Sequence, residues 1–361
     1  MDNYKFQFIQ KQVIASINDS ETSNQLLAKL EGLTVERDAE VDDLVSSYRP
    51  TTYMDTLEKP YVKGLDSGIP EFDQLTNGFQ PGTIGSACGF TGHGKSTFAL
   101  SFAFKNVKAG KKGIILSLEL SPELVFQQLE SRYMYEVKGL SITGQDLIHR
   151  KLSSDIEEKV KEYDQDFRQE ICENLIVLDE SYISKQIMLN YKAFSKLIRS
   201  FEKRLGGLDF IIFDHVGQLE LMYPDCGNMI IKQLQSFTKT YTDCRGIKPF
   251  SLFCVQTNRE GEKRARRRNG QYDLQAISDL NEVERSSTYV LFIYASDDMK
   301  VVQECKMTLS KHRLGPVLTE PVVTSFNPSV YTVGSAVDKV EFSDDDFNAL
   351  GSDFGFDDDE F

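Results

Sequence analysis

The octapeptide GFTGHGKS at residues 89–96 constrains the fold of this chain more than any other part of its sequence. It matches the pattern G-x-x-x-x-G-K-[ST] in full, and this pattern forms a phosphate-binding loop when it joins a buried strand to a helix. Both flanking signals are present, because residues 83–89 read as a short strand and residues 96–107, STFALSFAFKNV, read as a helix. The sequence therefore predicts a strand–loop–helix unit that holds a nucleotide.

The residue types in this loop indicate how the nucleotide is held. Glycines allow the backbone to wrap around phosphates, so that amide N–H groups and the helix N-terminus face the anion. We expect Lys95 to neutralise the β- and γ-phosphates and the Ser96 hydroxyl to bind Mg²⁺. The expected contacts to ATP, or to another nucleoside triphosphate, come from Gly89, Thr91, Gly92, Gly94, Lys95, Ser96 and Thr97.

Two acidic residues follow other predicted strands. Asp214 ends the apolar run LDFIIFD, and we expect it to hold Mg²⁺ together with Ser96, although an Asp in this place can also merely cap its strand. Glu119 lies near the end of KGIILSLEL, where a carboxylate can orient and deprotonate the water that attacks the γ-phosphate. The alternative for Glu119 is a surface residue, and His93 and His215 are interpreted as spacers or supporting contacts.

Short apolar runs alternate with longer amphipathic stretches in residues 61–335, which we take as one domain. The runs lie at 83–89, 112–120, 174–179, 208–214, 249–256 and 289–295. Such alternation predicts an α/β fold with a mainly parallel sheet flanked by helices on both faces. After residue 300, KMTLSKHR and PVVTSFN are expected to add antiparallel strands.

The segments outside this domain differ in character. Within residues 1–60, four apolar residues follow the i, i+3, i+4, i+7 spacing of an amphipathic helix, which packs on this chain's own core or on a neighbouring subunit. They are Val41, Leu44, Val45 and Tyr48. Residues 336–361 are acidic and rich in Gly, Ser and Asp, and this composition predicts a disordered tail.

Charge is spread unevenly along the chain. The formal net charge is −14, but residues 341–361 hold nine acidic residues and no basic one, which leaves −5 for residues 1–340. Residues 259–268 hold six basic residues against two acidic ones, without helix or strand periodicity. They predict a flexible basic loop that grips a DNA backbone, or else a solvated run of charge. The basic residues are Arg259, Lys263, Arg264, Arg266, Arg267 and Arg268.

Several classes of protein are excluded by what the sequence lacks. No apolar run reaches the roughly 20 residues that span a bilayer, and the start MDNYKFQFIQKQV lacks the apolar core of a signal peptide. The six cysteines include no C-x-x-C pair, and the four histidines lie far apart, so neither a zinc site nor a disulfide framework is expected. These features favour a cytoplasmic protein without a membrane partner.

The order of seven segments resembles the ATPase domain of DnaB-type replicative helicases, a family of hexameric motors with a RecA-like fold. The segments are GIPEFDQLTNGFQPG, GFTGHGKSTFAL, SLELSPE, FIIFDHVGQLE, VQTNRE, SDLNE and SKHRLGP. The resemblance covers residues 61–325. SLELSPE and K-x-R-x-G are narrower signals than the phosphate loop, which many ATPases share. Residues 1–60 are too short for a primase or for the full helical N-terminal domain of bacterial relatives.

The resemblance implies roles for single residues. Glu119 matches the family's catalytic carboxylate, and Asp214 matches its magnesium-associated acid. Gln256 matches the glutamine that senses the γ-phosphate and relays its state to the DNA loop. Lys311 and Arg313 match a pair offered across a subunit interface to the neighbour's nucleotide, where a cation stabilises the charge that spreads over the γ-oxygens. Without the resemblance, this pair reads as ordinary charge at the end of a strand.

The resemblance also implies a function and partners. It implies an ATP-driven, homo-hexameric helicase on single-stranded DNA, with residues 259–268 facing the central channel. A compact helicase domain with an acidic tail favours a phage protein in the host cytoplasm. A RecA- or RadA-type recombination ATPase and a non-helicase regulatory ATPase are the alternatives. The tail end SDFGFDDDEF fits either a docking peptide for a replication protein (polymerase, primase or loader) or a solubility tail.

Overall fold

The computed structural model divides into two compact units, Met1–Tyr61 and Val62–Phe361. The residues that it describes are 52–57, 63–224 and 226–334. Of the first unit, helix α3 (Tyr53–Leu57) is described. The helix expected at 41–48 and the tail expected at 336–361 lie outside the described residues.

A single sheet of nine described strands forms the centre of the second unit, in the order β3-β2-β4-β5-β1-β6-β7-β8-β9. The first six strands in this order pair in parallel, and β7, β8 and β9 extend the sheet antiparallel. The strands are β1 (Ile84–Gly89), β2 (Gly113–Ser117), β3 (Leu175–Leu178), β4 (Phe210–Asp214), β5 (Phe250–Gln256), β6 (Tyr289–Tyr294), β7 (Glu304–His312), β8 (Leu318–Asn327) and β9 (Thr332–Gly334). The predicted α/β fold with a mainly parallel sheet is confirmed.

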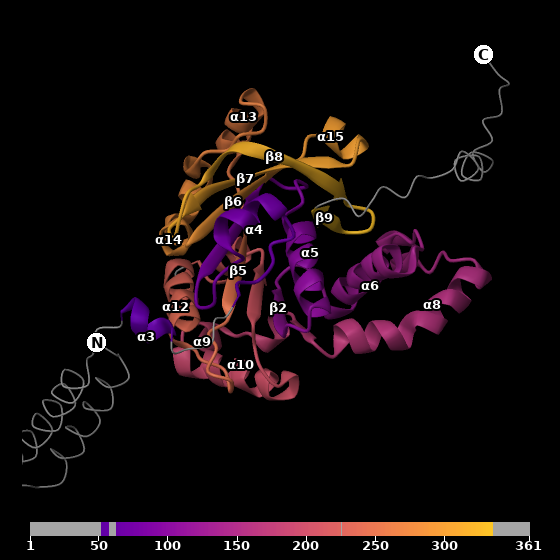
Figure 1. The fold of residues 1–361 in the computed structure, drawn as a ribbon, viewed down its shortest axis with the longest axis horizontal. Helices are drawn as coiled ribbons and strands as arrows, with labels where there is room; N and C mark the ends of the chain where they lie inside the picture. Colours follow the sequence, from indigo (N-terminus) through magenta and orange to yellow (C-terminus); the bar gives the residue numbers. More distant parts are fainter. Residues whose placement is uncertain (1–51, 58–62, 225, 335–361) are drawn as a thin grey trace, which may run out of the picture. The chain divides into compact units, whose positions relative to one another are not determined.

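Two apolar cores cover the two faces of the sheet. Successive residues of β4 alternate between them, with Phe210 and Ile212 in one core and Ile211 and Phe213 in the other. Helices α4, α5 and α6 contribute to the first core, and α9 to α12 contribute to the second (Figure 1). Because both faces are covered, a strand such as FIIF is apolar at every position rather than at every second one.

Helix boundaries follow capping signals in the sequence. Ser121 caps α6 through its side chain, Pro122 occupies the first turn, and Gly139 ends the helix in a left-handed conformation. Asn190 and Gly206 bound α10 in the same way. The helices of this unit are α4 (Pro70–Thr76), α5 (Lys95–Lys108), α6 (Pro122–Lys138), α7 (Gly144–His149), α8 (Ser154–Phe167), α9 (Lys185–Met188), α10 (Tyr191–Leu205), α11 (Gly217–Met222), α12 (Gly227–Thr240), α13 (Arg259–Arg267), α14 (Asn281–Ser286) and α15 (Asp297–Val301).

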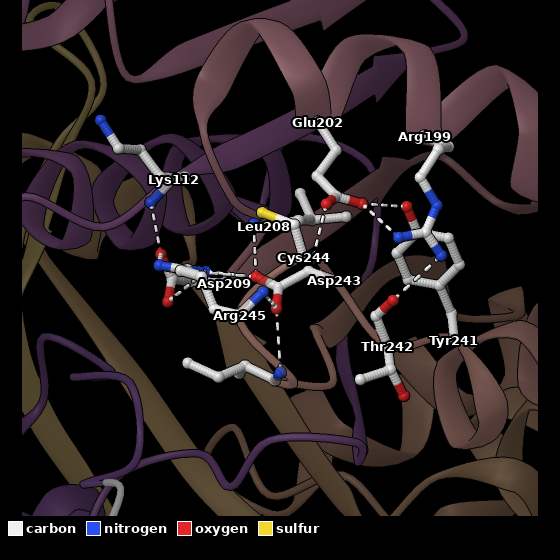
Figure 2. Close-up of polar contacts among 11 residues, drawn as sticks. Lys112, Arg199, Glu202, Leu208, Asp209, Tyr241, Thr242, Asp243, Cys244 and Arg245 are labelled. Atoms are coloured by element: carbon white, nitrogen blue, oxygen red, sulfur yellow. Dashed lines mark hydrogen bonds and ion pairs between the residues drawn. The ribbon is translucent and has the colours of Figure 1, made fainter.

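A polar network lies at the amino-terminal ends of the parallel strands. Figure 2 shows Arg245 between the carboxylates of Asp209 and Asp243, at N···O distances of 3.2 and 2.7 Å. Nearby, Glu202 on α10 accepts a hydrogen bond from the hydroxyl of Tyr241. These bonds hold the chain between α12 and β5 against the start of β4. The candidate site lies at the opposite, carboxyl-terminal ends of the parallel strands.

Candidate nucleotide and DNA site

The carboxyl ends of four parallel strands bring most of the predicted site residues together. β1 leads into the phosphate loop, and its last residue, Gly89, lies opposite Gln256 at the end of β5. β2 and β4 also end side by side, because Ser117 pairs with Asp214. Glu119 follows β2 by two residues. The expected phosphate and magnesium residues therefore meet Glu119 and Gln256 at the carboxyl ends of the strands, as ligand sites of open α/β sheets do.

The loop between β1 and α5 has the conformation that a phosphate requires. Gly92 and Gly94 have positive φ angles of 75° and 95°, and a Cβ at Gly94 would lie 2.7 Å from the ring of Phe326. Gly94 caps α5 without any side-chain hydrogen bond, and the first turn of α5 contains no acidic residue. The first N–H groups of α5 are therefore left for an anion, which fits a nucleotide phosphate.

Three polar side chains extend this site. The Nζ of Lys95 donates to the carbonyl oxygen of Phe90 at 3.2 Å, and burial lowers its pKa. The Oγ of Ser96 donates to Oδ1 of Asp214 at 3.1 Å. Burial raises the pKa of Asp214, while hydrogen bonds from Ser96 and Cys254 oppose that rise. A hydroxyl and a carboxylate in contact are hard oxygen ligands, so the pair fits Mg²⁺.

Glu119 is held by two residues of the β4–α11 connection. Its Oε1 accepts hydrogen bonds from Nδ1 of His215 and from Nε2 of Gln218, the latter at 3.3 Å. His215 follows Asp214 directly and has a left-handed backbone, with φ 69°. The sequence interpretation of His215 as a supporting contact agrees with this position. Gln218 was not foreseen, because nothing in the sequence shows which side chain of a short helix turns back to the strand ends.

The other histidine of the loop is packed inside the molecule. His93 is buried, its Nδ1 lies 3.1 Å from the hydroxyl of Tyr272, and its ring meets that of Tyr294 edge to face. Burial, followed by the charge of Lys300, lowers the pKa of His93 to about 4, so the ring is neutral at physiological pH. Tyr272 in turn stacks on Phe292. His93 and Tyr272 therefore pack the phosphate loop against β6.

Lys300 is a cation at the loop that sequence reasoning missed. It lies on α15, which follows the end of β6, and a Cβ added to Gly92 would be 3.7 Å from its Nζ. Its Nζ also contacts Oδ1 of Asp297 at 3.0 Å. No motif marks this position in the sequence, because α15 reaches the loop only through the pairing of β6 with β1.

The expectation of a flexible loop at 259–268 is wrong, because most of this segment is helix α13. Asn258 caps the helix, and its Oδ1 accepts from the backbone N–H of Gly261 at 2.7 Å. Glu260 and Glu262 lie in the first turn and three arginines lie in the last turn, as the helix dipole favours. The Asn258 cap and the placement of acidic residues before basic ones stabilise this helix. Neither feature produces apolar periodicity, so the helix was not predicted.

Four of the six basic residues in this segment form ion pairs with nearby carboxylates. Arg264 and Arg268 both reach Asp273, at 2.9 and 3.1 Å. Lys263 pairs with Glu260, and Arg266 pairs with Glu262. Among the described residues, Arg259 and Arg267 form no ion pair. Six bases against three acids leave residues 259–273 with a net charge of +3, so the surface of α13 remains positive.

Lys311 and Arg313 lie at the opposite edge of the sheet from their own phosphate loop. The amide of Arg313 donates to Thr288, whose amide donates to Ile84 at the start of β1. The loop begins at the other end of β1, roughly 17 Å away at ~3.3 Å per residue. The side chains of Lys311 and Arg313 donate to carbonyl oxygens at the end of α14 and just beyond it. The pair therefore cannot serve its own chain's nucleotide.

Comparison with known proteins identifies related chains. The model of the DnaB-like helicase C-terminal domain matches residues 64–332. The replicative DNA helicase DnaB of Mycoplasma genitalium is 24% identical over 273 residues, which are 71% of this chain and 53% of the relative. That of Haemophilus influenzae is 24% identical over 294 residues, 79% of this chain and 58% of the relative. The chain spans about half the length of these curated relatives.

Solved structures show the same fold. A DnaB-like replicative helicase, described with its interactions with primase, superposes with a TM-score of 0.61 at 16% identity, over 92% of this chain and 76% of that one. A second solved structure, of an isolated ATPase domain, gives a TM-score of 0.59 at 18% identity, over 88% of this chain and all of that one. The RecA-like fold expected from the sequence is therefore confirmed. Among the described residues, no helix is both long and apolar enough to cross a bilayer.

Proposed function

Because the chain belongs to the DnaB-like helicase C-terminal domain family, we propose that it is an ATP-driven helicase that moves on single-stranded DNA and unwinds duplex DNA at a replication fork. One observation carries the proposal. The phosphate loop, the Ser96–Asp214 pair and Glu119 meet at one edge of the sheet, inside the region that the family model matches. This is the set of groups that nucleoside triphosphate hydrolysis needs.

Each group of the site has a defined task in this proposal. Magnesium-bound ATP supplies the γ-phosphoryl group whose transfer to water drives movement. The amides of the loop and Lys95 bind and neutralise the phosphates, while Ser96 and Asp214 hold the metal ion. Glu119 accepts a proton from the attacking water. Gln256 is exposed at the end of β5, beside the last residue of β1, and is placed to sense the γ-phosphate.

Subunits of a ring complete each other's sites. Lys311 and Arg313 lie side by side, and burial followed by the charge of Arg313 lowers the pKa of Lys311. Two adjacent cations at the sheet edge far from their own loop are suited to a neighbour's γ-phosphate, where they stabilise the charge of the transition state. A homo-hexamer, the assembly implied by the family resemblance, supplies such a neighbour to every subunit.

The basic surface of α13 is the proposed contact to single-stranded DNA. One residue separates Gln256 from Asn258, which caps α13. A change in the γ-phosphate state at Gln256 therefore has a short path to Arg259, Arg267 and the other cations of the helix. Their charge suits the phosphates of a DNA backbone. We place the protein in the cytoplasm, with replication proteins such as a polymerase, primase or loader as further partners.

A strand-displacement assay tests the proposal. Purified full-length protein is mixed with forked duplexes carrying 5′ or 3′ single-stranded tails, with and without ATP and Mg²⁺, and particles are imaged by negative-stain electron microscopy. We expect ATP-dependent unwinding by ring-shaped particles. Filaments that pair strands without unwinding them would instead indicate a recombination ATPase.

Matched lysine variants make the assay specific for the site. Lys95→Ala is expected to abolish both ATP hydrolysis and unwinding, because it removes the cation at the phosphates. Lys203→Ala, on the exposed surface of α10, is the control and should keep both activities. Near-normal turnover by Lys95→Ala would contradict the assignment of the site. Hydrolysis without any effect of DNA on its rate would favour a regulatory ATPase.

A further inference from the structure

We infer that His215 and Gln218 are positioning residues that restrain Glu119, and that they make ATP hydrolysis depend on the placement of α11. The inference rests on the proposed function, because it concerns the carboxylate assigned there to activate water. In the structure, Oε1 of Glu119 accepts hydrogen bonds from both His215 and Gln218. No feature of the sequence connects Gln218 with this carboxylate.

The geometry places both donors on one short piece of backbone. The amide of Gln218 donates to the carbonyl oxygen of His215 at 2.9 Å, so the two residues form a single turn at the start of α11 (Gly217–Met222). Glu119 reaches this turn because β2 and β4 are neighbours and end in register at Ser117 and Asp214. A shift of α11 therefore moves both donors together relative to Glu119.

The contacts hold the carboxylate of Glu119 at the α11 turn. Both donors bind Oε1, so only Oε2 remains to accept a proton from water. The side chain of Glu119 is 44% exposed, so little packing besides these two bonds fixes its orientation. Losing both donors frees the carboxylate to turn toward a water molecule at the γ-phosphate.

The backbone of His215 has an uncommon conformation. A non-glycine residue in the left-handed region is disfavoured and persists only where its surroundings hold it. His215 has φ 69°, directly after the buried metal-binding candidate Asp214. Its ring contacts Glu119.

The element that carries the donors is buried on one side and exposed on the other. Leu221 on α11 is 73% exposed, although it is a large apolar residue. Val216 and Leu219 are buried in the second core, so a ligand can act on α11 only through its exposed side, where Leu221 lies. α11 follows β4 and α13 follows β5, and these two strands are parallel neighbours. Under the proposed function, single-stranded DNA that contacts α13 also contacts α11, and this contact is what releases Glu119.

Steady-state ATP hydrolysis by the full chain, without and with single-stranded DNA, tests the inference. His215→Asn keeps a residue type that tolerates the left-handed backbone but removes the ring. Gln218→Met keeps the size of the side chain but removes the donor. We expect each variant to raise the DNA-free kcat about fivefold, the change that loss of one hydrogen bond makes to an equilibrium, while KM for ATP stays within about twofold. The ratio of DNA-stimulated to DNA-free turnover should fall correspondingly.

Two further variants keep the outcomes separable. Gln165→Met, at an exposed position of α8, controls for the loss of a glutamine and should leave both rates unchanged. Glu119→Gln should abolish turnover; if it does not, the proposed function fails rather than this inference. If Glu119→Gln is inactive while His215→Asn and Gln218→Met leave the DNA-free kcat unchanged or lower it, the restraint is refuted. Thermal unfolding of both variants confirms that they are folded.

Discussion

Lys300 places a cation beside the phosphate loop although it belongs to no motif. Its Nζ is close to Gly92 and lowers the pKa of His93, so its charge acts at the phosphate loop. We expect Lys300→Ala to raise KM for ATP about fivefold, in the range of one charge-assisted hydrogen bond, with little change in kcat. Initial-rate measurements at varied ATP concentration check this. Lys203→Ala is a control of equal chemistry, and an unchanged KM in Lys300→Ala would exclude a contact to the nucleotide.

A second residue, Asp73, predicts a pH dependence of stability away from the site. Burial, and then a hydrogen bond shared with Asp66, raise the pKa of Asp73 to about 7. The folded state thus binds a proton that the unfolded state releases near pH 4. This contribution to stability is complete below the unfolded pKa and is lost as the pH rises through about 7.

The measurement compares thermal unfolding of the native chain and Asp73→Asn between pH 5.5 and 8.5. Asn resembles the protonated carboxyl and keeps the oxygen that accepts from the amide of Ser67. The melting temperature of the native chain is expected to fall by roughly 3 °C more than that of the variant. Parallel curves for the two proteins would show that Asp73 does not titrate in this range.

Single residues of the site were predictable to different degrees. The placement of Ser96, Asp214 and Glu119 together could be predicted, because each follows shortly after a strand that an apolar run reveals. Gln218 and Lys300 could not, since their positions depend on how α11 and α15 fold back over the strand ends. The contacts of these two residues arise from the order of strands in the sheet, which the sequence does not display.

At the level of elements, α13 shows that a charge pattern can be read from the sequence while the helix that carries it is missed. The density of positive charge was visible in the sequence, but the helix was not, because Ala265 is its only strongly apolar residue. The helical form has a consequence for DNA binding. It ties four cations to carboxylates and leaves Arg259 and Arg267 without an ion pair among the described residues.

We therefore expect substitution of a cation without an ion pair to weaken DNA binding more than substitution of an ion-paired one. Arg267→Ala should weaken binding of single-stranded DNA and reduce its salt dependence by a slope of about 0.7, the value for one phosphate contact. Arg264→Ala should change both less, because two hydrogen bonds of 3.1 and 2.9 Å hold Arg264 to Asp273. Fluorescence anisotropy of a labelled oligonucleotide at several salt concentrations measures both quantities. Equal effects of the two substitutions would contradict a role for the unpaired arginines.

On the scale of the whole molecule, the sequence predicted the strands of the sheet better than the roles of the residues at the strand ends. Each of the predicted apolar runs became a strand, because burial on both faces makes such runs continuous and easy to find. The net charge of −14 conceals the basic helix α13, since it averages that helix with the acidic residues 341–361. Neither pattern indicates which residues would serve a neighbouring subunit. The family resemblance suggests Lys311 and Arg313, and their placement on the sheet supports that proposal.

Lys311 and Arg313 lie about one strand length from their own phosphate loop, so under the proposed function they serve the nucleotide of another subunit. We expect Arg313→Ala to bind ATP but hardly hydrolyse it. Glu119→Gln is expected to be inactive for a different reason, because its base is lost. In a ring of mixed subunits, an interface that pairs the intact Glu119 of one variant with the intact Arg313 of the other has a complete site. Mixing the two inactive proteins should therefore restore part of the ATPase activity, with a maximum near equal amounts. Absence of recovery at every ratio, with mixed rings confirmed by mass photometry of size-tagged subunits, would place Arg313 outside the neighbour's site.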